Sequence, residues 1–169
     1  MTTMTEETTR TVQVYRVYIK ATPQAIWDAI TKPEWADRYG YGGFPEYGDL
    51  QPGTEYRIIA GTGMQQMGVS GPVIDGQILE SDEPRRLVQT WRMLMDEAIA
   101  VEGFTKLSYE IEPLDGGVTK LTVSHDVTGA PKLAAIVAGE HERFGAGGGW
   151  AWALSDLKSL LETGTAFTH

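Results

Sequence analysis

The sequence predicts an α+β fold in which an antiparallel β-sheet wraps a long C-terminal helix. Three observations lead to this prediction. Near the end of the chain a glycine run, 145–149, leads into an amphipathic segment that carries Trp150 and Trp152. Between residues 55 and 127, strand-like runs alternate with turn signals. Before them, one strand-like run precedes two short helical segments. A sheet must bury its apolar face, and the terminal helix offers a surface for it.

The first strand is expected over 11–20, where β-branched and aromatic residues follow one another without glycine or proline. Thr22 and Pro23 indicate a helix start, because the Thr hydroxyl caps a helix and Pro is tolerated at its first position. A second short helix is expected over 31–38, and the glycine-rich segment 39–45 is expected to be a loop.

The middle of the chain reads as an antiparallel meander. Two features separate its strands: the segment 61–68, rich in glycine and methionine and expected to be a loop, and Asp115-Gly116-Gly117, a tight hairpin signal. Alternation in the last two strands places Tyr109 and His125 on inward faces. The five strands of the meander are expected over 55–60, 73–80, 86–93, 104–112 and 118–127.

The end of the chain is predicted to be helical. A short helical segment is expected over 132–137, and the terminal helix follows the glycine run and stops at Gly164. One stripe of the terminal helix carries Trp150, Leu154, Leu157 and Leu161. A chain of 169 residues fits one domain, so we expect a disordered N-terminal tail over 1–10, a single domain over 11–164 and a C-terminal tail over 165–169, with His169 disordered.

The composition excludes several classes of partner. The formal net charge is -9 and the acidic residues are scattered, so nucleic acid and anionic membranes should be repelled. With no cysteine, the chain has no disulfide and no thiolate chemistry. Residues 1–10 carry no apolar run that resembles a signal peptide or membrane anchor, and we expect a cytoplasmic protein. An exposed sheet edge and loop aromatics are compatible with a homodimer.

Three short motifs do not carry the chemistry they first suggest. The segment 61–66 has Gln66 where a dinucleotide fingerprint needs its third glycine. The glycine run 145–149 lacks the Lys-Ser/Thr pair of a phosphate loop. His141-Glu142 begins like a zinc-protease helix, but Gly145 stands where the second histidine belongs. We therefore expect no cofactor and no metal.

Aromatic and polar residues on inward faces are the candidates for a binding site. His125 titrates near neutral pH and lies on an apolar strand face, so it is either a polar group of a pocket or a buried histidine satisfied by a neighbouring carbonyl. The alternative for the aromatic residues is core packing, which accounts for at least half of them. The full aromatic set is Trp27, Trp35, Tyr39, Tyr41, Phe44, Trp91, Tyr109, Phe144, Trp150 and Trp152.

Two acidic residues of one predicted strand raise a further question. Asp75 and Glu80 have opposite parity, so only one of them shares a face with the core. A buried carboxylate needs a partner, and Arg92 or His125 are the candidates. The sequence leaves open which carboxylate faces inward.

Three segments carry a resemblance to a known superfamily. They are 17–23 with Ile26-Trp27, 82–88 with Trp91, and 148–164. In this order they resemble the helix-grip proteins of the START/SRPBCC superfamily, and more narrowly the bacterial proteins related to the C-terminal domain of the heat-shock-protein-90 ATPase activator. The resemblance implies a curved sheet around the last helix and a reusable pocket that hosts carriers, cyclases, hydrolytic enzymes and protein-binding modules.

Together the residues and the resemblance lead to one expectation and two alternatives. The expected function is binding of a small hydrophobic or amphipathic molecule between the sheet and the terminal helix, with Trp91, Tyr109, His125 and Trp150 as ligand-binding residues. The first alternative is a cyclase- or hydrolase-type enzyme that uses His125 as its catalytic acid or base. The second is a protein-binding module that regulates a chaperone ATPase. Whether any reaction is catalysed stays open at this stage.

Overall fold

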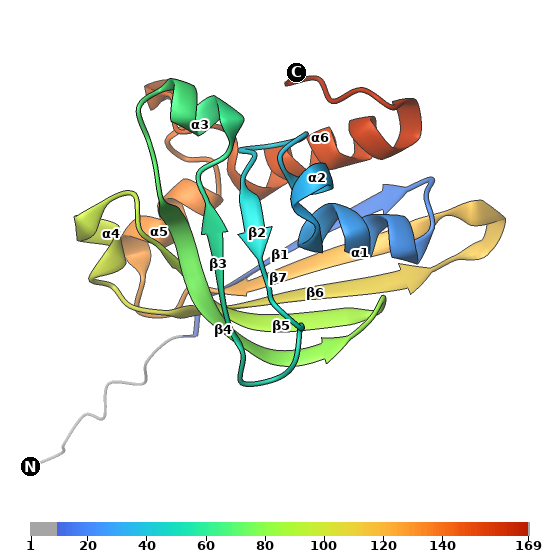
Figure 1. Cartoon of the computed structure of the whole chain (residues 1–169), viewed down its shortest axis with the longest axis horizontal. Helices are drawn as coiled ribbons and strands as arrows, with labels where there is room; N and C mark the ends of the chain where they lie inside the picture. The colour runs from blue at the N-terminus through green and yellow to red at the C-terminus, as the bar shows by residue number, and fades with distance from the viewer. Residues whose placement is uncertain (1–9, 169) are drawn as a thin grey trace, which may run out of the picture.

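A curved antiparallel sheet forms the body of the protein, and its helices lie mainly above one face of the sheet (Figure 1). The computed structural model describes residues 10–168. The seven strands of this part of the chain are β1 (Val12–Ile19), β2 (Phe44–Glu46), β3 (Glu55–Ile59), β4 (Pro72–Asp82), β5 (Arg86–Met93), β6 (Thr105–Pro113) and β7 (Thr119–Asp126). The helices are α1 (Pro23–Thr31), α2 (Pro33–Ala36), α3 (Thr62–Gln66), α4 (Glu97–Ala100), α5 (Pro131–Val137) and α6 (Gly149–Thr163), with short 3₁₀ turns η1 (Asp115–Gly117) and η2 (Glu142–Phe144).

The strand order is β1-β7-β6-β5-β4-β3-β2, and each neighbouring pair is antiparallel. The strands β3 to β7 are neighbours in both sequence and space, as the meander predicts, β2 extends this order at one edge, and β1 pairs with the last strand. This register sets Gln13 opposite His125 and Trp91 opposite Thr105. The α+β helix-grip prediction is confirmed, with α6 packed against β1 and α1 against β6.

Local sequence signals explain the two helices after β1. The Thr22 hydroxyl accepts a hydrogen bond from the Ala25 backbone N–H at 3.1 Å, and Pro23 occupies the first helical position, as predicted. On the buried side of α1, Ile26 and Trp27 are inaccessible to solvent or nearly so. The helix therefore covers part of the inward sheet face.

The terminal helix follows its predicted boundaries closely. It begins at Gly149 and ends before Gly164, which adopts the left-handed conformation with φ 82°. Leu154 and Leu157 are buried as the stripe predicts, but Leu160 is more deeply buried than Leu161. A straight α-helix advances 3.6 residues per turn, so the buried stripe drifts from Leu161 to its neighbour.

Three short elements differ from the sequence expectation or go beyond it. The predicted loop 39–45 ends in β2, and the predicted loop 61–68 contains α3. A third, α4, lies in the acidic connection before β6 and begins where the Asp96 side chain accepts from the Ala98 N–H. Such short elements carry no periodic pattern, and tertiary contacts decide them. At α3 the contact is Asp37, whose carboxylate accepts from the Thr62 N–H and hydroxyl.

The structure answers the question about the two carboxylates of β4. Asp75 shares the outward face with Gln77 and forms two hydrogen bonds to Arg92, at 3.0 and 2.7 Å. Glu80 is exposed after a bulge in the strand and pairs with Arg86. Neither carboxylate lies on the core face, and the predicted partner Arg92 is the one that Asp75 uses.

The ends of the described chain are tied to the sheet and to α6. Arg10 pairs with Asp126 at 3.0 Å, and the remainder of the predicted N-terminal tail, 1–9, lies outside the described residues, as does His169. After α6 the chain turns back: Ala166 is buried, and the Phe167 N–H donates to the buried Asp156 carboxylate at 2.7 Å. Residues 165–168 thus pack against the terminal helix.

Candidate functional site

The four predicted binding residues lie together on the concave face of the sheet. Trp91 comes from β5, Tyr109 from β6, His125 from β7 and Trp150 from the first turn of α6. The His125 ring centre lies 5.2 Å from that of Trp91 and 6.0 Å from that of Trp150, both nearly at right angles, and the Tyr109 and Trp150 ring centres are 6.2 Å apart. Edge-to-face aromatic packing of this kind joins the helix to the sheet. Below, these four residues are called the histidine cluster.

A chain of hydrogen bonds fixes the protonation of His125. The Trp150 indole Nε1–H, which can only donate, donates to His125 Nδ1 at 3.1 Å. His125 Nδ1 is therefore unprotonated, and Nε2 carries the proton. Nε2 lies 2.8 Å from Thr105 Oγ1, whose own hydroxyl donates to the Trp91 carbonyl at 2.8 Å. Every hydrogen-bonding atom of the imidazole has a partner, and Thr105, which was not predicted as a site residue, links the histidine cluster to the Trp91 backbone.

Burial keeps this histidine neutral. His125 is fully inaccessible to solvent, and the loss of hydration lowers its pKa from 6.5 to about 4, while the nearby Asp126 carboxylate acts in the opposite direction. At neutral pH the ring is therefore uncharged. The ring accepts a hydrogen bond from Trp150 of α6 and donates one to Thr105 of β6. Of the two interpretations of His125, this agrees with a buried histidine whose hydrogen bonds are satisfied, although its partners are a tryptophan and a threonine and not a carbonyl.

A second polar group on the same face is not satisfied. Gln89 lies on β5 between Leu87 and Trp91 on the inward side and is fully buried. Neither its Oε1 nor its Nε2 has a hydrogen-bond partner among the described residues. An unpaired buried polar group costs about 1–3 kcal/mol. Gln89 was not among the predicted site residues, although it shares its strand parity with Trp91, which places both on the inward face.

Buried phenols complete the interior. Burial raises the pKa of Tyr39, Tyr47, Tyr56 and Tyr109, so all four are uncharged. Two of them donate to backbone carbonyls: Tyr39 to Ala29 and Tyr56 to Thr90. Tyr47 stacks on Tyr56 with ring centres 4.9 Å apart. The space between the sheet and the helices is thus lined by aromatic side chains and by neutral polar groups.

The glycine run before α6 is closely packed. Gly147 and Gly149 have φ values of 74° and 69°, which favour glycine, and a Cβ on Gly149 would overlap the Val137 carbonyl. Tyr41 joins the segment to the loop before β2, because its hydroxyl accepts from the Gly149 N–H at 2.9 Å and donates to the Ala146 carbonyl at 3.1 Å. The structure therefore shows a closely packed segment at the start of α6.

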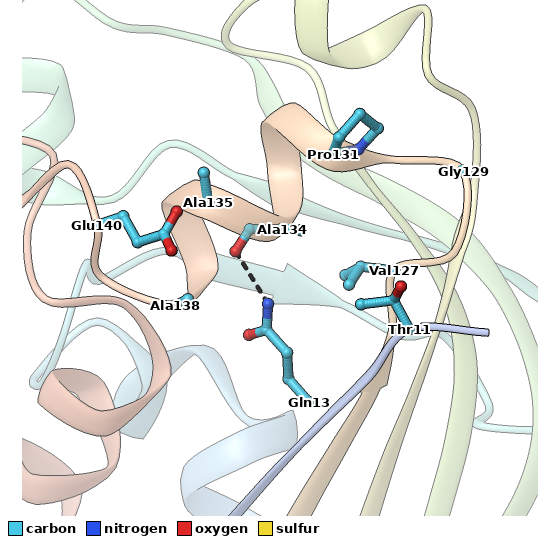
Figure 2. Close-up of a pocket in the computed structure, with 9 residues that line it drawn as sticks. All are labelled: Thr11, Gln13, Val127, Gly129, Pro131, Ala134, Ala135, Ala138 and Glu140. Carbon is cyan, nitrogen blue, oxygen red and sulfur yellow. Dashed lines mark hydrogen bonds between the residues drawn. The ribbon is translucent and has the colours of Figure 1, made fainter. Parts of the chain in front are cut away.

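A surface groove of about 360 Å³ opens beside the histidine cluster. Figure 2 shows it between the start of β1 and α5, with Gln13 donating to the Ala134 carbonyl at 2.9 Å. Gln13 is also the cross-strand neighbour of His125. The groove therefore lies next to the end of the concave face that carries the cluster. Its lining residues are Thr11, Gln13, Val127, Gly129, Pro131, Ala134, Ala135, Ala138 and Glu140.

Over residues 10–168, no three His, Asp or Glu side chains gather closely enough to hold a metal ion. No helix in the same range combines the length and the apolar character needed to cross a bilayer.

Comparison with known proteins identifies relatives of the whole fold. A family model described as "Activator of Hsp90 ATPase homolog 1-like protein" matches residues 20–162. A search of curated proteins finds no match. An HSP90 activator from Plasmodium falciparum is similar in structure, with a TM-score of 0.59, 15% identity, and coverage of 89% of this chain and 95% of that one.

Two bacterial structures are similar to the same extent. The Aha1 dimer from Colwellia psychrerythraea has a TM-score of 0.59 at 20% identity, with 91% of this chain and 98% of that chain covered. A protein from Staphylococcus saprophyticus has a TM-score of 0.62 at 14% identity, covering 93% and 96%. At these identities the likeness shows a shared fold.

Proposed function

The chain belongs to the family of Activator of Hsp90 ATPase homolog 1-like proteins, and on this premise we propose that it binds a small hydrophobic or amphipathic molecule between the concave sheet face and α6. The observation that carries the proposal is the histidine cluster. Three strands and the first turn of a helix bring Trp91, Tyr109 and Trp150 around one neutral imidazole. Aromatic walls with a few placed polar groups are typical of small-molecule sites.

The position of the cluster supports a route of entry. Trp150 is the residue directly after the glycine run, and its indole donates a hydrogen bond to His125 Nδ1. The groove in Figure 2 reaches Gln13, which lies opposite His125 on the neighbouring strand. A small displacement of the α6 N-terminus would open the concave face toward this groove. The ligand would then lie between Trp150 and the sheet, with its apolar surface against both.

A titration with 1-octanol tests this proposal. We expect 1-octanol to raise the melting temperature of the wild-type protein in a saturable way, because a ligand that binds only the folded state stabilises it. Trp150→Phe should weaken the effect several-fold. The matched control is Trp152→Phe on the same helix, whose ring packs against Tyr41 and Phe167, outside the cluster. Absence of saturable stabilisation, or equal loss in the two variants, would contradict the proposal.

Regulation of a chaperone ATPase is the second candidate function. The family description and the activator from Plasmodium falciparum favour it. The region around α4 also exposes apolar side chains, with Val101 74% and Phe104 53% accessible, and exposed apolar surface commonly marks protein contacts. We expect such a module to raise the ATPase rate of an Hsp90 protein, and Val101→Glu to reduce that rise while His141→Ala does not. An unchanged ATPase rate would exclude this candidate.

The enzyme alternative with His125 as acid or base is the least favoured. Both ring nitrogens are engaged in hydrogen bonds, and the lowered pKa leaves the ring a weak base at neutral pH. A hydrolase or cyclase activity that follows a single ionisation near pH 4 and disappears in His125→Gln would restore this alternative.

A further inference from the structure

Gln89 stands at the centre of the concave face. Its strand, β5, is the fourth of seven in the sheet order and lies between β6 and β4 in Figure 1. Its neighbours across the sheet are Ile78 on β4 and Leu107 on β6, both fully buried. The amide therefore lies among aliphatic side chains at a position that a leucine would fill without cost.

Within residues 10–168, the polar atoms of this side chain form no hydrogen bond of normal geometry. Oε1 and Nε2 are both buried and unpartnered among the described residues. Burial raises the pKa of the Tyr47 phenol, and the Gln89 amide lies close enough to its hydroxyl to lower that pKa to a smaller extent, but the two groups do not reach hydrogen-bond geometry. Buried polar groups are paired in the great majority of positions in folded proteins, so a fully buried amide with two free atoms is an exception that calls for a partner.

The surroundings specify the charge of that partner. The inward neighbours of Gln89 are apolar or aromatic, and the cationic Arg86 and Arg92 of the same strand pair with carboxylates on the outer face. Burial opposes ionisation of the nearby phenols of Tyr47 and Tyr109. An anion would lose its hydration here without gaining a counter-ion.

We infer that the Gln89 amide recognises a neutral head group of the ligand, one that both donates and accepts a hydrogen bond, as a carboxamide or a hydroxyl does. The inference rests on the proposed function and adds its chemical class: an uncharged molecule with an apolar body and one such group at its inner end. A primary carboxamide matches best, because its C=O and N–H pair with the Nε2–H and Oε1 of Gln89 in one plane.

Three eight-carbon probes separate the head-group chemistry. Octanamide donates and accepts, methyl octanoate only accepts, and octanoate is an anion at neutral pH. Tryptophan fluorescence titrations of the full chain give the dissociation constant of each probe. We expect octanamide to bind about tenfold more tightly than methyl octanoate, and octanoate to bind most weakly. In Gln89→Leu, octanamide and methyl octanoate should bind with a ratio of dissociation constants of about one, because leucine lacks the amide atoms that pair with the head group. Gln77→Leu, the same change on the outer face of β4, should retain the preference for octanamide.

The outcomes distinguish this inference from the proposed function. If all three probes bind the wild-type protein with similar constants, or if Gln89→Leu keeps the octanamide preference, Gln89 does not recognise the head group, although binding between sheet and helix stands. If none of the probes binds the wild-type protein, both the inference and the proposed function fail. Circular dichroism of each variant checks folding, and Gln89→Met replaces Gln89→Leu if the leucine variant does not fold.

Discussion

Two polar side chains on the same concave face differ in what the protein provides for them. His125 has a partner at each ring nitrogen and joins α6 to the sheet. Gln89, two strands away, is equally buried and has none among the described residues. The satisfied group stabilises the fold, while the unsatisfied one reduces its stability. We interpret the first as architecture at the edge of the proposed site and the second as its recognition point.

Removing the His125 side chain should have the largest effect on stability. We expect His125→Ala to lower the free energy of unfolding by about 3–4 kcal/mol, because it leaves the Trp150 N–H and the Thr105 hydroxyl unpaired and opens a void. Urea denaturation gives the value. His141 is exposed, so His141→Ala should change it by less than about 0.5 kcal/mol. Equal values for the two variants would show that the hydrogen-bond chain contributes nothing.

A low pH should weaken the packing around His125 in the wild-type protein and so lower its free energy of unfolding. The folded-state pKa of His125, about 4, lies below its unfolded value of 6.5, so the unfolded chain binds the proton more tightly. The stabilisation from the neutral ring is present above pH 6.5 and is lost as the pH falls toward 4, by about 3 kcal/mol. Urea denaturation between pH 7 and 4 measures it.

His125→Gln is the comparison for this pH dependence, since glutamine can accept from Trp150 and donate to Thr105 without titrating. Its stability should fall less than that of the wild-type protein over the same interval. Parallel curves for the two proteins would assign the acid sensitivity to carboxylates, such as Asp126, and not to the histidine.

Weakening one bond of the cluster should have a smaller effect. Trp150→Phe removes the donor to His125 Nδ1 and should cost about 1–2 kcal/mol more than Trp152→Phe, which loses the same ring volume on the same helix. Thermal denaturation of both variants gives the difference. No difference would mean that packing alone holds Trp150 against the sheet.

Replacing Gln89 should have the smallest effect on stability, and this effect should have the opposite sign. Gln89→Leu is expected to raise the free energy of unfolding by about 1 kcal/mol, since an apolar side chain of similar size carries no unpaired atoms. For Gln77→Leu, whose amide donates to the Gly53 carbonyl at the surface, we expect a change within about 0.5 kcal/mol. A destabilised Gln89→Leu protein would show that Gln89 has a structural role in the core.

The sequence predicted most of the fold because its long elements carry periodic patterns and caps. Thr22-Pro23, the alternation around Tyr109 and His125, and Gly164 each placed an element correctly. The short elements β2, α3 and α4 depend on tertiary contacts such as that of Asp37 with Thr62, which no local pattern reveals.

The candidate site was predicted in part for a related reason. The alternation of side chains along the strands predicted the strand residues of the histidine cluster, since residues on one face of a sheet lie close together in space. The same parity marked Gln89 as inward, but only the structure shows that its amide lacks a partner. Hydrogen-bond satisfaction depends on every neighbour of a group, and a sequence gives those neighbours only through the fold.

The central claim, that a small amphipathic molecule binds between the concave face and α6, is tested most directly by NMR. In a titration of ¹⁵N-labelled protein with 1-octanol, the account predicts saturable shifts of the Trp91 and Trp150 indole N–H signals and of the Gln89 side-chain amide. The indole signal of Trp35, a residue of α2 whose ring lies under the Arg38 guanidinium, should not move. If the shifts are absent, or are confined to signals outside the histidine cluster such as that of Trp35, the claim is wrong.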